Sequence, residues 1–158
     1  MAKAREVEGL KAGDALAVAA GKVVAVRAQE LFDHQEGVLD TSDIERVHAM
    51  RVASRRLRAV LEIFAPAFPR RELKPVLRDV ERLADALGAR RDPDVQIEHF
   101  ERLRAALPEA DHAGVDEILA RLRGEQAAGN ERLAAALEEA RESRLHERLA
   151  ALAAGVSA

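Results

Sequence analysis

The chain has 158 residues and a mass of 17.2 kDa, the size of a single domain that can bury its own core. Its only aromatic residues of the Phe, Trp and Tyr types are four Phe, which excludes a stacking platform for bases. The absence of Cys excludes a disulfide framework, a thiol nucleophile and a cysteine-type zinc site. The net charge of −3, taken alone, argues against an anionic ligand.

The elements in chain order are all expected to be helices, because Ala, Leu, Glu and Arg dominate and no segment alternates with period two. We predict an all-α antiparallel bundle of five to six helices in one domain over residues 1–158, with its core at about 12–154. The expected helices span residues 14–36, 43–64, 69–87 and 92–107, followed by one that begins near 111 and a short last one around 145–152.

Helix boundaries are indicated by caps and by glycine and proline. N-caps are expected at Asp14, at Ser42 with Glu45 as a capping box, and at Asp92 ahead of Pro93. Gly88 is expected to end the helix before Asp92. Heptad-like spacing favours a continuous helix through residues 129–130, whereas the Gly-Asn pair there favours a break, so this point stays open.

The positive charge is concentrated in one segment. Residues 44–91 hold 12 basic and six acidic side chains, a net charge of +6, which leaves −9 for the rest of the chain. Such asymmetry indicates an anionic partner for the basic segment.

Within this segment, two helices each combine an apolar face with a basic stripe. At about 100° per residue, one stripe covers an arc of about 80°. It consists of His48, Arg51, Arg55 and Arg58. The next helix has the same pattern, with Arg71, Lys74, Arg78 and Arg82 opposite its apolar residues. Like charges at this spacing repel, so the stripes indicate either an extended anion or neutralisation by acids from later helices.

Two motifs carry a family resemblance. Residues 48–58 match H-x-x-R-V-x-x-R-R-L-R at every fixed position, and this run resembles the signature of the CHAD domains, the conserved histidine α-helical domains. Residues 87–95 are similar to the family's L-G-x-x-R-D-x-D-V, and Ser143-Arg144 is a weaker echo of a later motif.

The resemblance implies a helical module that binds inorganic polyphosphate through its basic stripes. We expect this module to be non-catalytic, with no cofactor and no metal. By motif position, the phosphate-binding residues would be His48, Arg51, Arg55, Arg56 and Arg58, joined by Arg91. Arg71, Lys74, Arg78 and Arg82 rest on the helical-wheel argument. The resemblance also implies association with polyphosphate granules or with a triphosphate tunnel metalloenzyme.

Typical family members are longer and have two similar helical halves, whereas this chain resembles about one half. His99 and Arg102 repeat the H-x-x-R spacing without a following Arg pair. We therefore expect two copies to form a homodimer with two-fold symmetry, against a monomer with a shallower basic face.

Two other functions stay open, a protein–protein scaffold and a general polyanion or nucleic-acid binder. The chain has no Walker A loop, GxGxxG, GxSxG or zincin-type His pair, which weighs against an enzyme. No apolar run reaches the ~20 residues of a membrane span and residues 1–10 lack a signal-peptide stretch, so we expect a cytoplasmic protein without membrane contact.

Overall fold

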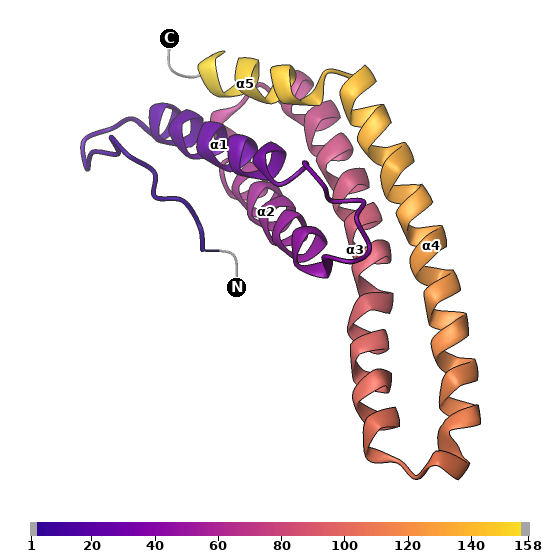
Figure 1. The fold of residues 1–158 in the computed structure, drawn as a ribbon. Helices are drawn as coiled ribbons and strands as arrows, with labels where there is room; N and C mark the ends of the chain where they lie inside the picture. Colours follow the sequence, from indigo (N-terminus) through magenta and orange to yellow (C-terminus); the bar gives the residue numbers. More distant parts are fainter. Residues whose placement is uncertain (1–2, 156–158) are drawn as a thin grey trace.

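The computed structural model describes residues 3–155, and within this range it contains five α-helices and no strand (Figure 1), so the predicted all-α class is confirmed. The helices are α1 (Leu16–Asp33), α2 (Ile44–Ile63), α3 (Arg70–Ala106), α4 (His112–Glu142) and α5 (Leu145–Gly155). Short 3₁₀ helices, Ala65–Ala67 and Glu109–Asp111, lie before α3 and α4. No described helix is both long and apolar enough to cross a membrane.

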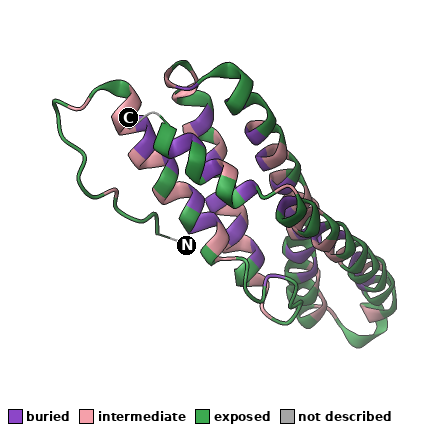
Figure 2. Ribbon diagram, turned by 90° about the horizontal axis from the view of Figure 1, so that it is seen from above, coloured by how far each residue is buried: buried purple, intermediate pink, exposed green. Residues whose placement is uncertain are grey.

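The long helices α3 and α4 form an antiparallel hairpin, and α1, α2 and α5 pack around one end of it (Figure 1). All five helices contribute to the main core at that end. The other end, residues 95–125, is here called the distal arm. It has a separate small core of Ile97, Val115, Leu119 and Leu122, and most of its other residues are exposed (Figure 2).

The prediction that one helix ends at residue 87 and another begins at residue 92 is wrong. The helix α3 is continuous over 37 residues and runs through Gly88, Asp92 and Pro93. Asp92 is therefore an exposed residue in the helix interior and not a cap. Proline inside a helix costs about 3 kcal/mol because it lacks an N–H for the carbonyl four residues earlier, here that of Ala89. Packing against α4 offsets this cost, since Leu87, Pro93 and Ile97 are all buried.

The open question at residues 129–130 is decided by the same packing, and α4 is continuous there. Gly129 is buried directly against α3. A Cβ atom at this position would lie 3.0 Å from the Ala89 carbonyl oxygen and 3.0 Å from the Arg90 Cα. Because Gly129 has no side chain, the backbones of α3 and α4 can pack closely here. This packing stabilises the helical conformation of Gly129 and Asn130, a pair that otherwise favours a turn.

Two predicted caps are also wrong. The Ser42 hydroxyl donates to Asp40 Oδ1 at 2.7 Å, and no side chain caps the start of α2, so the capping box with Glu45 does not form. Asp14 lies before α1 but does not cap it. Its carboxylate instead accepts hydrogen bonds from the Lys11 backbone N–H and from Lys22 Nζ. The Lys22 hydrogen bond is the main cause of the lowered pKa of Asp14.

Candidate anion-binding surface

The predicted apolar faces of α2 and α3 are confirmed, and they fix which side chains point outward. The buried apolar residues of α2 include Val47, Met50, Leu57 and Leu61. Those of α3 include Leu73, Val76, Val80, Leu83 and Leu87. Because these faces pack into the main core, the basic stripes of both helices lie on the opposite, solvent side.

The stripe on α2 holds two arginines without a counter-ion. Arg51 is half-buried and Arg55 is exposed, and neither forms an ion pair with an acidic group among the described residues. His48, half-buried on the same face one turn before Arg51, also has no hydrogen-bond partner there. These three side chains form the first part of the candidate surface.

Arg58, the last member of that stripe, is neutralised. Its Nε lies 2.8 Å from Glu62 Oε1, and its Nη2 lies 3.4 Å from Glu81 Oε1 of α3. The hydrogen bond to Glu62 is the largest cause of the raised pKa of Arg58, and the charges of Glu62, Glu81 and Asp85 add to it. The pair with Glu81 shows that the α2 stripe borders α3.

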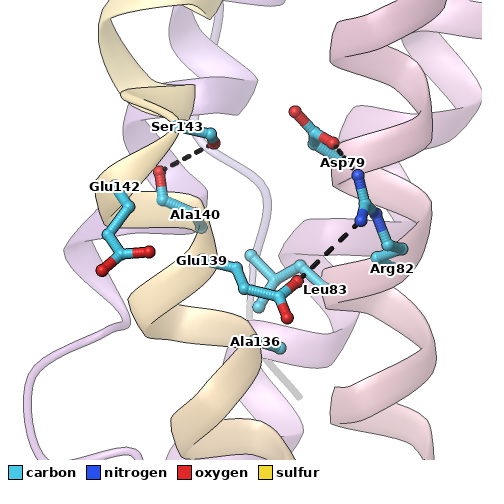
Figure 3. A pocket seen from close by; sticks show the side chains of 8 residues that line it. All are labelled: Asp79, Arg82, Leu83, Ala136, Glu139, Ala140, Glu142 and Ser143. Carbon is cyan, nitrogen blue, oxygen red and sulfur yellow. Dashed lines mark hydrogen bonds and ion pairs between the residues drawn. The ribbon is translucent and has the colours of Figure 1, made fainter.

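The stripe on α3 divides between two sides of the helix. Lys74 and Arg78 are exposed and form no ion pair with a described acidic group. Arg82 turns toward α4. Its guanidinium lies 2.6 Å from Asp79 of the same helix and 3.9 Å from Glu139 of α4, beside a pocket of about 380 Å³ (Figure 3). Arg71 is highly exposed and lies 3.5 Å from Glu72. Acids therefore neutralise part of this stripe, whereas Lys74 and Arg78 stay available.

Arg56 of the first motif has a structural contact. Its Nη1 lies 3.3 Å from Oε1 of Glu30, a carboxylate on α1 that is only 2% exposed. The other oxygen of Glu30 accepts from Arg27 at 2.6 Å. Since Arg56 helps to satisfy a buried charge between α1 and α2, its side chain is turned away from the candidate surface.

In the second motif, Asp94 rather than Asp92 contacts the arginines. Arg91, whose side chain is 12% exposed, has its Nη1 3.8 Å from Asp94 Oδ2. The fully buried Arg90 donates from Nη1 to Asp94 Oδ1 at 2.5 Å. Asp92 is exposed and makes no contact of this kind within the described chain. Arg91 is thus largely buried, and its ion-pair partner is Asp94.

Sequence reasoning missed the buried polar cluster around Arg90. Arg90 Nε donates to Asn130 Oδ1 at 3.0 Å, and Gln126 of α4 donates to Asp94 Oδ1 at 2.6 Å. Asn130 also donates to the Leu39 carbonyl, in the loop before α2. The i, i+4 spacing of Arg90 and Asp94 indicates an ion pair only if both residues belong to one helix, and the expected break after residue 87 placed Arg90 outside any helix. Four buried polar atoms of this cluster have no hydrogen-bond partner among the described groups: Arg90 Nη2, Arg91 Nε, Arg91 Nη1 and Asp94 Oδ2.

Unpaired positive charge is concentrated on α2 and α3. Within residues 3–155, eight lysines and arginines form no ion pair with a described acidic group. Five of the eight are Arg51, Arg55, Arg70, Lys74 and Arg78. In the same part of the chain, no group of three or more His, Cys, Asp or Glu side chains is placed to hold a metal ion.

Comparison with known proteins gives one family. The comparison with curated proteins and that with solved structures each gave no significant match. The family model described as "CHAD domain" matches residues 22–158, which include α2, α3, α4 and both motifs. This match covers most of the chain, and the protein therefore belongs to the CHAD domain family.

Proposed function

We propose that this protein binds inorganic polyphosphate, without catalysis, on the surface formed by the exposed sides of α2 and α3. CHAD domains are linked in general to polyphosphate binding, and membership of the family supports the proposal. The residues assigned to the ligand are Arg51 and Arg55 on α2 and Lys74 and Arg78 on α3, with His48 beside them. Location at polyphosphate granules and association with a triphosphate tunnel metalloenzyme remain predictions from the family.

The observation that carries the proposal is the set of positive charges left without acidic partners on these two helices. Most arginines elsewhere in the described chain have a carboxylate within 4.0 Å, as Arg104 has in Asp116 at 2.5 Å. Arg51 and Arg55 have none within residues 3–155, although they lie one helical turn apart and repel each other. An anion along the surface would remove this repulsion.

The chemistry of these side chains suits phosphate oxygens. Each guanidinium donates two parallel hydrogen bonds to a phosphate, whereas the Lys74 ammonium acts as a compact point charge. A charged hydrogen bond contributes about 1.5–3 kcal/mol, so four such groups are sufficient for a stable complex. The surface lacks aromatic side chains for base stacking, which favours polyphosphate over single-stranded nucleic acid.

The direct test is calorimetric titration with long-chain polyphosphate at several salt concentrations. Four phosphate contacts give an expected log–log salt slope of about −3, taking ~0.7 per contact as for single strands. The double variant Arg51→Ala/Arg55→Ala is expected to bind at least about tenfold more weakly, since each lost contact is worth more than the 1.4 kcal/mol of a tenfold change. Its slope should be about half as steep.

The matched control is Arg121→Ala/Arg132→Ala, which removes the same charge from exposed positions on α4. It should bind as the original chain does. Equal affinity for single-stranded DNA of the same charge would show a general polyanion binder, and absence of binding to both would favour a protein scaffold. Release of free phosphate during the titration would contradict the non-catalytic proposal.

A further inference from the structure

Acidic side chains lie in the middle of the proposed surface. Glu62 and Glu81 hold Arg58 from two helices, at 2.8 and 3.4 Å, and the charge of Asp85 acts on the same guanidinium. We call the carboxylates of Glu62 and Glu81, which both contact the Arg58 guanidinium, the acidic belt. Asp85 lies about 6 Å further along α3, on the side of Arg51. The two glutamates and Arg58 are all substantially exposed, with side chains between 37% and 47% accessible. The belt therefore lies where a bound anion would have to pass.

The unpaired cations lie on opposite sides of this belt. Because α2 and α3 run antiparallel and Arg58 faces Glu81, Arg51 lies about 10 Å from the belt in one direction along the helix axes and Lys74 about 10 Å in the other. The two nearest unpaired cations across the belt, Arg55 and Arg78, are about 9 Å apart along the axes. The α2 end of the surface thus holds His48, Arg51 and Arg55, and the α3 end holds Lys74 and Arg78.

We propose that the acidic belt separates two anion-binding ends, and so makes the protein selective for polyphosphate chains long enough to reach both. The inference rests on the proposed function. Its specificity-determining residues are Glu62 and Glu81, which keep Arg58 from completing a continuous basic surface.

A short anion meets only one end. It gains two or three cations there, and it cannot use Arg58 without replacing the charge-assisted bond to Glu62, while Glu81 and Asp85 repel it. A long chain binds one end and presents the rest of its length to the other end at high effective concentration. This second contact, with the cations of the other end, multiplies the affinity because it forms within the complex.

Removal of the belt should weaken the discrimination by length. In Glu62→Gln/Glu81→Gln, Arg58 is released and joins Arg51 and Arg55 in a single patch that a short anion can fill. We expect the affinity for pyrophosphate to rise by more than the affinity for long-chain polyphosphate. The ratio of the two association constants should fall by at least about tenfold, since a linked second contact supplies roughly 10²–10⁴-fold in affinity.

The matched control is Glu117→Gln/Glu131→Gln, which adds the same charge at exposed positions of α4 that have no ion-pair partner among the described residues. Titrations of the three proteins with pyrophosphate and with long-chain polyphosphate, at one salt concentration, give the ratios. A fall confined to Glu62→Gln/Glu81→Gln supports the belt. An unchanged ratio, or an equal fall in the control, overturns the belt and leaves the proposed function intact. Failure of the original chain to bind long polyphosphate overturns both.

Discussion

Arg90 is the largest fully buried side chain of the described protein, and its charge is balanced mainly by Asp94. Two charges without solvent contact are costly to bury, and their attraction offsets this cost only when further hydrogen bonds satisfy them. Asn130 and Gln126 of α4 supply two such bonds, at Arg90 Nε and Asp94 Oδ1, while Arg90 Nη2 and Asp94 Oδ2 have no hydrogen-bond partner among the described groups. A buried pair of this kind is more sensitive to loss of one partner than any exposed ion pair of the chain.

We therefore predict that Asp94→Asn lowers the free energy of unfolding by about 3 kcal/mol, because it leaves the Arg90 charge buried without a counter-ion. Asp92→Asn, two residues away and exposed, should change it by less than about 0.5 kcal/mol. Urea denaturation followed by circular dichroism measures both. Equal effects of the two variants would show that the motif acts through Asp92 as well.

The helix α3 shows how packing against a neighbouring element overrides local preference. Gly88 and Pro93 are typical of helix ends, and together they cost about 4 kcal/mol inside a helix. The burial of Leu83, Leu87 and Ile97 along one face holds the helix together through them. The glycine of α4, Gly129, is required for the close contact between the two helices. A Cβ atom at Gly88, in contrast, would meet no neighbouring group within 4 Å, so no contact requires that glycine.

The two glycines should therefore respond in opposite ways to alanine. Gly88→Ala should raise the free energy of unfolding by about 0.5–1 kcal/mol, because alanine fits the space and restricts the unfolded chain. Gly129→Ala should lower it by about 1–3 kcal/mol, because the new methyl group meets the backbone of Ala89 and Arg90. Thermal and urea unfolding of both variants provides the measurement, and destabilisation by Gly88→Ala would contradict the continuous helix.

At the scale of the molecule, charge is separated along the long axis. The distal arm, residues 95–125, holds seven acidic and four basic side chains, whereas the opposite end carries the candidate surface. A net charge of −3 on the arm thus lies away from the phosphate-binding residues. The overall charge of −3 does not argue against an anionic ligand, because ligand binding depends on the local potential.

We propose that two copies pair about a two-fold axis, since the chain resembles one half of a domain that usually has two similar halves, and two-fold dimers are the commonest symmetric oligomers. Light scattering after size-exclusion chromatography should then give twice the 17.2 kDa of one chain. A mass of one chain across the accessible concentration range would show that the single basic surface acts alone.

Local periodicity and two short motifs were sufficient to predict the helical class, the apolar faces of α2 and α3, and the family. Which cations have acidic partners depends instead on how the helices pack. The contacts of Arg58 with Glu81, of Arg82 with Glu139 and of Arg56 with Glu30 join different turns or helices, and helical periodicity within one segment contains no information on them. The buried Arg90 cluster and the continuous α3 likewise depend on where α4 packs, through Gly129 and Asn130, about 40 residues further along the chain.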